Sequence, residues 1–180
     1  MSEPNLQPVL KGPSLTVRPI TADDWEALYS AAADPKLWAQ HPANDRWERT
    51  VFRKFFDAAI ACETAFVFVD NESHAIVGSS RYNGYDSKRS EIEIGWTFIA
   101  RSHWGGATNA EVKTLMLDHA FTFVETVVFW VGETNHRSRG AMQKIGGVMR
   151  EGVHHRALAG DAPHVIFEIS RSRWKAQPPG

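Results

Sequence analysis

Two glutamates lie two positions apart in the middle of this 180-residue chain. Glu91 and Glu93 belong to the segment EIEIGWTF, where polar and apolar residues alternate, so a strand would carry both carboxylates on one face. Two carboxylates that approach each other raise each other's pKa, which suits a general base that works near neutral pH. We favour Glu93 over Glu91 as that base. The alternative is that both are solvent-facing strand residues opposite Lys88 or Arg89.

A glycine-bearing turn follows this segment and precedes a predicted helix. Apolar residues from Val112 to Phe123 recur at spacings of three and four, which predicts a helix from Asn109 to about Val124. Glycines permit unusual dihedral angles, so several main-chain N–H groups can point into one concavity at the positive end of the helix. That concavity suits a phosphate, and the alternative is a tight turn that only joins strand to helix. The turn consists of Trp104, Gly105, Gly106, Ala107, Thr108 and Asn109, and it is neither a Walker loop nor a Rossmann fingerprint.

A third group of reactive side chains lies in the segment KLWAQHPANDRW. Trp38, His41 and Arg46 are crowded there between Pro35 and a second predicted helix, which makes the segment a candidate substrate loop. The alternative is an aromatic plug that packs two helices together.

Other candidate groups are more scattered. A turn that holds Tyr82 and Tyr85 could also shape a substrate pocket. His154 and His155 are a second candidate for the base. The eight histidines show no H-x-x-x-H spacing and no nearby acidic cluster, so the sequence predicts no metal site.

Composition restricts the class of partner. The chain has 20 Lys and Arg against 21 Asp and Glu, a formal charge of −1, so bulk charge favours neither nucleic acid nor an anionic membrane. Cys62 is the only cysteine, which fits a reducing compartment. No apolar run reaches the length of a membrane span, and the polar N-terminus lacks a signal-peptide core. We expect a cytoplasmic protein, either a monomer or a homodimer.

The elements that must position these residues form a mixed α/β order. We expect strands at 15–18, 66–69, 76–82, 91–98, 127–131, 148–155 and 164–170, and helices that begin near 21, 48, 109 and 138. Strands 66–69, 76–82 and 91–98 read as an antiparallel meander. The helix between 91–98 and 127–131 makes those two strands parallel neighbours, which leaves a crevice at their carboxyl ends. We expect residues 1–13 to be a flexible extension, 14–175 a single domain, and 176–180 a tail.

Six strings in this order resemble the GCN5-related N-acetyltransferase superfamily, in particular its ribosomal-protein-acetyltransferase-like (RimJ/RimL-like) branch. They are LTVRPITADDWEAL, IVGSSRY, EIGWTFIARSHWGG, NHRSRGAMQKIGG, VMREGVHHR and VIFEISRSRW. The resemblance spans about residues 15–174. It implies a mostly antiparallel sheet with a central parallel strand pair splayed around the cofactor and flanked by helices.

The resemblance also implies acetyl-CoA as the cofactor. Its pyrophosphate would be held by the main chain of the turn from Trp104 to Asn109, where Trp104 stands in place of the usual Gln or Arg. Asn135 would bond the pantetheine arm and Ser138 could protonate the leaving thiolate, although both are also ordinary helix-capping residues. A main-chain N–H of the preceding strand could polarise the thioester carbonyl, and the strand residues assigned to the cofactor are Trp96, Thr97, Phe98 and Ile99.

The resulting expectation is an N-acetyltransferase that transfers acetyl directly to a primary amine of a protein N-terminus or a small molecule. The alternative is a non-catalytic acyl-CoA-binding sensor or interaction module on the same fold. An enzyme needs a titratable group near the acceptor amine and an open path to the thioester, whereas a pure binder needs neither.

Overall fold

The computed structural model describes residues 3–157 and 160–176. In this part of the chain one mixed sheet holds the strands in the order β1-β2-β3-β4-β5-β6-β9-β7, with β8 also paired to β9. The strands are β1 (Leu10–Lys11), β2 (Leu15–Pro19), β3 (Ala65–Asp70), β4 (Ile76–Asp86), β5 (Glu91–Ile99), β6 (Thr126–Gly132), β7 (Val148–Met149), β8 (His154–Arg156) and β9 (Ala162–Ser170). The predicted meander of β3, β4 and β5 is confirmed, because both pairs are antiparallel.

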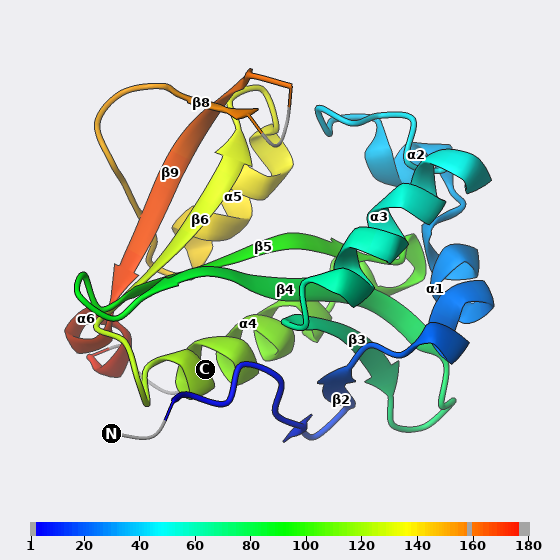
Figure 1. The fold of residues 1–180 in the computed structure, drawn as a ribbon, viewed down its shortest axis with the longest axis horizontal. Helices are drawn as coiled ribbons and strands as arrows, with labels where there is room; N and C mark the ends of the chain where they lie inside the picture. Colours follow the sequence, from blue (N-terminus) through cyan, green and yellow to red (C-terminus); the bar gives the residue numbers. More distant parts are fainter. Residues whose placement is uncertain (1–2, 158–159, 177–180) are drawn as a thin grey trace.

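The sheet opens between β5 and β6. These strands are parallel, as predicted, but they pair only from Glu91 opposite Thr126 to Glu93 opposite Val128. Beyond Val128, β6 continues in register with β9, and Figure 1 shows β6 and β9 rising away from β4 and β5. The structure therefore has the splayed central pair that the resemblance implies.

A bulge in β5 marks the point of separation. The pairing with β4 moves from Arg81 opposite Gly95 to Ser79 opposite Phe98, which leaves one extra residue on β5. Trp96 lies in this stretch with a φ of 52°, a left-handed conformation that costs a bulky residue free energy. Strained positions of this kind are concentrated at functional sites.

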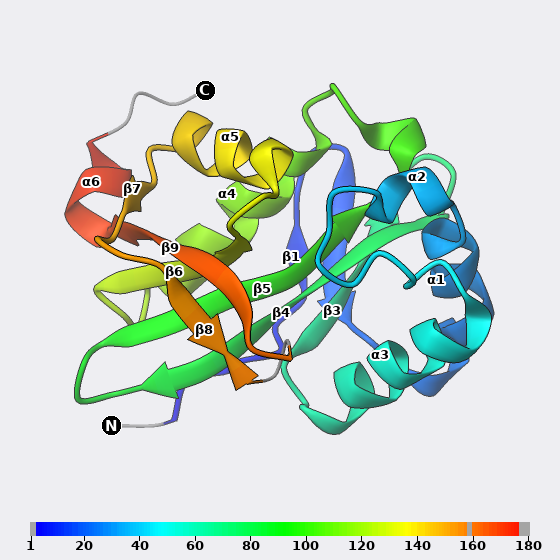
Figure 2. The same ribbon diagram turned by 90° about the horizontal axis from the view of Figure 1, so that it is seen from above.

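Helices cover both faces of the sheet. They are α1 (Trp25–Ala32), α2 (Pro35–Trp38), α3 (Arg49–Ala61), α4 (Thr108–Ala120), α5 (His136–Lys144) and α6 (Arg171–Lys175), with 3-10 turns at Ala22–Asp24 and Arg101–His103. Figure 2 shows α1, α2 and α3 gathered at one end of the sheet, away from α4 and α5. Each group buries a separate apolar cluster: Leu28, Phe52 and Phe56 on the α1–α3 side, and Val112 and Met116 below α4.

Three expectations about the elements differ from the structure. Residues 3–13 are not a loose extension, because Leu6 and Leu10 pack against the core and β1 pairs with β2. The helix predicted to reach Val124 ends at Ala120. The strand predicted over 148–155 is divided into β7 and β8, which both pair with β9.

Residues 1–2 of the predicted extension and 177–180 of the predicted tail lie outside the described residues. Within the described ranges, none of the helices combines the length and apolarity that a membrane span needs.

Candidate functional site

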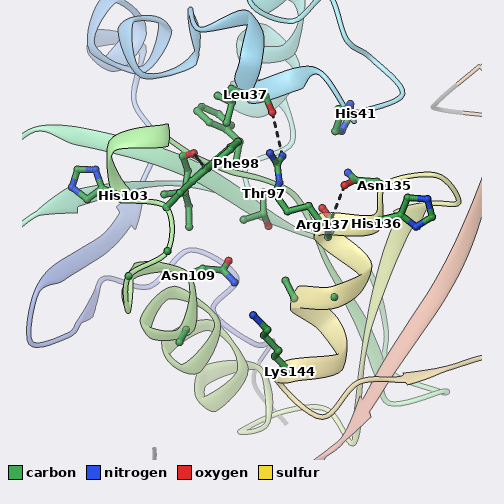
Figure 3. A pocket seen from close by; sticks show the side chains of 18 of the residues that line it. Leu37, His41, Thr97, Phe98, His103, Asn109, Asn135, His136, Arg137 and Lys144 are labelled. Carbon is green, nitrogen blue, oxygen red and sulfur yellow. Dashed lines mark hydrogen bonds between the residues drawn. The ribbon is translucent and has the colours of Figure 1, made fainter.

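A cleft of about 670 Å³ lies between the end of β5, the start of α4 and helix α5, and we call it the large cleft. Figure 3 shows its walls: α4 and α5 face each other, and the segment around α2 closes the far side. Asn109 from α4 and Lys144 from α5 point into it from opposite sides. Predicted cofactor residues that line it are Thr97, Phe98, Ile99, Trp104, Gly105, Gly106, Asn109, Asn135 and Ser138; Trp96, Ala107 and Thr108 are absent from the lining.

The turn before α4 has the form expected of an anion site. Gly105 adopts a φ of 75°, and a side chain built on Gly106 would meet no atom within 4 Å. The first helical hydrogen bond runs from the N–H of Glu111 to Ala107 O, 2.9 Å away, so the N–H groups before Glu111 have no acceptor one turn back. These donors and the helix dipole favour a negative group at this end of the cleft.

Asn135 and Ser138 meet at the start of α5. Asn135 Oδ1 accepts a hydrogen bond from the Ser138 N–H at 3.2 Å, so the capping alternative is confirmed. Asn135 is buried at 4% exposure and still lines the large cleft. The cap uses only its amide oxygen, so the amide nitrogen keeps two donors. The capping role and the cofactor role are therefore compatible.

Arg137 crosses the mouth of the large cleft. Its guanidinium lies 4.1 Å from the centre of the Trp104 ring and donates to Leu37 O at 3.2 Å. Trp104 is itself held by a hydrogen bond from its Nε1 to Ile99 O, 2.8 Å away. Partial burial lowers the pKa of Arg137 from its ordinary value.

A second cavity of about 320 Å³ adjoins the first, and we call it the small pocket. His41 lines both cavities and so marks their junction. The walls of the small pocket come from the 41–46 segment, β5, β6, β8 and β9. They include His41, Pro42, Arg46, Glu93, Trp96, Trp130, Arg156 and His164.

The two candidate glutamates are each held by a separate arginine. Glu93 is buried at 5% exposure and accepts two hydrogen bonds from Arg156, both 2.6 Å, and one from Asn83 at 2.9 Å. Glu91 accepts a bond from Arg150 at 2.5 Å. The expected approach of the two carboxylates is replaced by these pairs, and only Glu93 lines a cavity. The alternative partners Lys88 and Arg89 do not form these pairs.

The predicted substrate residues divide into two groups. Trp38, His41 and Arg46 lie at the two cavities, as expected of a substrate loop. Tyr82 does not, because its ring is fully buried and its hydroxyl donates to Met116 O at 2.6 Å. Tyr85 packs edge-on against Phe123 and lines neither cavity. Neither tyrosine lines the two cavities, and β4 continues to Asp86 where a turn was expected.

Two residues of the site were missed at the sequence level. Arg156 closes the small pocket from β8, and the string GVHHR contains no signal for its pairing with Glu93, 63 residues away. Lys113 is buried at 3% exposure and donates to Thr97 Oγ1 at 3.1 Å, behind the wall of the large cleft. Burial lowers the pKa of Lys113 to about 7. Of the described residues, no group of three His, Cys, Asp or Glu could hold a metal ion.

Comparisons with known proteins agree with this geometry. A model of the acetyltransferase (GNAT) domain matches residues 14–148. No curated protein sequence matches the chain. A GCN5-related N-acetyltransferase from Brucella melitensis superposes with a TM-score of 0.83 at 18% identity, over 94% of this chain and 81% of that chain. A GNAT-family acetyltransferase from Bacillus anthracis gives 0.73 at 19% identity, over 92% and 99%.

A third solved structure carries ligands. Spermidine N-acetyltransferase from Vibrio cholerae, in complex with CoA and spermine, superposes with a TM-score of 0.68 at 16% identity, over 91% of this chain and 99% of that chain. At these identities the likeness concerns the fold.

Proposed function

The chain belongs to the acetyltransferase (GNAT) family, and from that premise we propose that it transfers an acetyl group from acetyl-CoA directly to a primary amine. The observation that carries the proposal is the opening of the sheet after Glu93. The N-terminus of α4 and the Asn135-capped N-terminus of α5 lie at the cleft beyond this opening. Acetyl-CoA would supply the acetyl group as a thioester. The chain must hold that thioester beside an amine and manage two protons.

The residues of the large cleft fit such a cofactor. The N–H groups at the start of α4 offer a site for the pyrophosphate, and Lys144 and Arg137 add positive charge nearby. Within β5, the main-chain N–H groups from Trp96 to Phe98 lie where no β6 partner accepts them, and we propose that they polarise the thioester carbonyl. Asn135 would bond the pantetheine arm.

Direct transfer forms one bond from nitrogen to carbon and breaks one from carbon to sulfur. One proton leaves the amine and one reaches the departing sulfur. We propose Ser138, which lines the large cleft, as the donor to sulfur. We propose Glu93 as the group that accepts the amine proton, in preference to Glu91, which lines neither cavity.

The first test is calorimetric titration with acetyl-CoA, with desulfo-CoA and ATP as controls. We expect micromolar binding of both CoA compounds and none of ATP at the same concentration. Acetyl-CoA binding followed by acetyl transfer to an amine supports the enzyme. Binding without transfer to any amine favours the alternative, an acyl-CoA sensor, and absence of binding contradicts both.

A second test separates the two roles that Glu93 can have. Glu93→Gln removes the buried partner of Arg156 and should destabilise the protein by about 3 kcal/mol, because a buried charge loses its counter-charge. Glu93→Gln combined with Arg156→Gln removes both charges and should restore much of that stability. If Glu93 is the base, the restored double variant stays inactive. If activity returns although both side chains are gone, Glu93 is not the base and serves only to balance the charge of Arg156.

Several finer statements stay proposals. We propose the RimJ/RimL-like branch from the six sequence strings, a cytoplasmic location from the single cysteine, and a monomer or homodimer that uses neither nucleic acid nor a membrane. A protein N-terminus and a small molecule both remain within the proposed acceptor class.

A further inference from the structure

Two hydrogen-bond donors face each other in the small pocket. Nδ1 of His41 accepts a hydrogen bond from the Ala43 N–H at 2.9 Å. Because a main-chain N–H can only donate, Nδ1 is the unprotonated nitrogen. In the neutral ring the proton is therefore on Nε2. Nε2 lies 3.5 Å from Nη1 of Arg46, which is also a donor. Among the described residues, neither His41 Nε2 nor the Arg46 guanidinium donates to an acceptor.

Arg46 carries a charge that the described residues leave without an ion pair. Its guanidinium lies 5.0 Å from the centre of the Phe55 ring and 5.6 Å from that of Trp38, so aromatic rings fix its plane. Burial and the charge of Arg81 lower its pKa to about 10, and neighbouring Asp45 opposes this. A planar cation that is held in place and lacks a carboxylate is suited to bind one.

The surroundings add positive charge to the small pocket. Its one carboxylate, Glu93, is engaged by both outer nitrogens of Arg156. The guanidinium of Arg81 lies 3.4 Å from the centre of the Trp96 ring, and that of Arg156 lies 4.5 Å from it. His41 adds no charge, because burial and Arg46 lower its pKa to about 3. Arg46 and Arg156 therefore line the small pocket with Arg81 close by, and Glu93 is the one carboxylate in the lining.

From this arrangement, and resting on the proposed function, we propose that the acceptor is a small amine with a carboxylate beside its amino group, such as a free amino acid, and that Arg46 and His41 bind this carboxylate. The position of His41 at the junction of the cavities places an amine a few bonds away at the opening of β5 and β6. A volume of about 320 Å³ suits a ligand of this size. A polyamine such as spermidine would instead bring positive charge to positive charge.

The same charges help the amine to react. Nearby cations disfavour the ammonium form and so raise the fraction of neutral amine, which is the form that attacks a thioester. In such a pocket a general base has to remove the amine proton less often than it would in a negatively charged pocket. Carboxylate binding and amine activation follow from the same guanidinium groups.

The test compares each free amino acid with its carboxamide, and with spermidine, as acceptors for wild type and Arg46→Gln. We expect at least one free acid to be acetylated with a kcat/KM about 10- to 100-fold above that of its carboxamide, the effect of one charged hydrogen-bonding pair. In Arg46→Gln this ratio should fall to near one, mainly through KM. Arg46→Lys should keep part of it, because the charge stays and the planar fork is lost.

Arg53→Gln is the matched control, since Arg53 is an exposed arginine that also lies against an aromatic ring, that of Trp25. It should keep the wild-type ratio. Thermal unfolding of each variant checks that the fold is intact. Preference for carboxamides or spermidine in wild type, or an unchanged ratio in Arg46→Gln, would overturn the proposal.

A binding measurement separates this proposal from the acetyltransferase assignment. Calorimetry with the free acids and carboxamides, with and without desulfo-CoA, needs no turnover. If the protein transfers no acetyl group but binds free acids through Arg46, the carboxylate site stands and the proposed function fails. If acetyl transfer occurs and the free acids show no advantage in rate or binding, the function stands and this inference fails.

Discussion

Lys113 should make the protein less stable at neutral pH than at alkaline pH, and its removal should reveal this. The side chain is buried at 3% exposure, and no carboxylate of the described residues pairs with it. Its Nζ donates to Thr97 Oγ1 at 3.1 Å and lies 4.9 Å from the centre of the Phe129 ring. Burial therefore lowers the pKa of the folded lysine from 10.5 to about 7.

The sign of the effect follows from proton counting. Between pH 7 and pH 10.5 the unfolded chain binds a proton at Lys113 that the folded chain releases, so the wild-type free energy of unfolding rises with pH across this window. At and below pH 7 the penalty is nearly complete. The linkage relation gives a cost of about 4 kcal/mol at pH 7 and about 2 kcal/mol at pH 9.

Lys113→Met keeps the length of the apolar stem and removes the titrating group. It also removes the hydrogen bond to Thr97, a loss of about 1 kcal/mol that does not depend on pH in this range. We expect a net stabilisation of about 3 kcal/mol at pH 7 that shrinks to about 1 kcal/mol at pH 9. The difference of about 2 kcal/mol between the two pH values is independent of packing changes that are common to both.

Urea unfolding at pH 7 and pH 9 measures these free energies for wild type, Lys113→Met and the control Lys54→Met. Lys54 is exposed on α3, so its variant should follow wild type at both pH values. The reasoning that Lys113 is an uncompensated buried amine would be refuted if Lys113→Met changed the free energy of unfolding equally at pH 7 and pH 9. It would also be refuted if the variant were destabilised more at pH 7 than at pH 9.

Three further predictions test the site. Gly105→Ala should cost about 1 kcal/mol of stability, because the φ of Gly105 is 75° and alanine is strained there. At Gly106 an added methyl group meets no protein atom, so Gly106→Ala should leave urea unfolding unchanged. The methyl group would instead occupy space in the proposed pyrophosphate site and weaken acetyl-CoA binding about tenfold in calorimetry. Asn135→Ala should lower the free energy of unfolding by about 1 kcal/mol, because the helix cap is lost. Asn135→Ser keeps a capping oxygen, so any loss of acetyl-CoA affinity in this variant reports on the cofactor role alone. Below pH 6.5 the unfolded chain binds a proton at His41, whereas the folded chain does not until its lowered pKa of about 3 is reached. The wild-type free energy of unfolding should therefore fall by about 2 kcal/mol between pH 7 and pH 4.5 through this group, and urea unfolding of His41→Gln should lack this part of the loss.

The opening in the sheet was predictable, whereas its electrostatics were not. Alternation in EIEIGWTF and the change to helical spacing define the order β5, turn, α4 and β6, and a right-handed crossover then makes β5 and β6 parallel neighbours. Alternation also placed Glu91 and Glu93 on one face. Their partners Arg150 and Arg156 come from segments 59 and 63 residues away, and local patterns contain no information on such pairs.

The burial of Lys113 shows a second limit of pattern reading. The sequence predicts an apolar stripe on α4 from Val112 to Phe123 at spacings of three and four, whereas the buried side of the helix is Val112, Lys113, Met116, Leu117 and Ala120. Two adjacent stripes both satisfy spacings of three and four, so periodicity does not choose between them. Tertiary contacts decide which stripe is buried, since the amine of Lys113 lies over the Phe129 ring and donates to Thr97 Oγ1.

The proposed pyrophosphate site before α4 depends on main-chain groups, so a tryptophan at position 104 is compatible with it. By the resemblance, Trp104 stands where the family usually has Gln or Arg, and the proposed anion site would use the main-chain N–H groups that follow it. The φ of Gly105 and the unpaired N–H groups at the start of α4 persist with tryptophan in place. The indole is meanwhile fixed by Ile99 O and supports the guanidinium of Arg137 at 4.1 Å. A cation therefore still lies at the mouth of the cleft, but it comes from α5 and is held there by an aromatic ring.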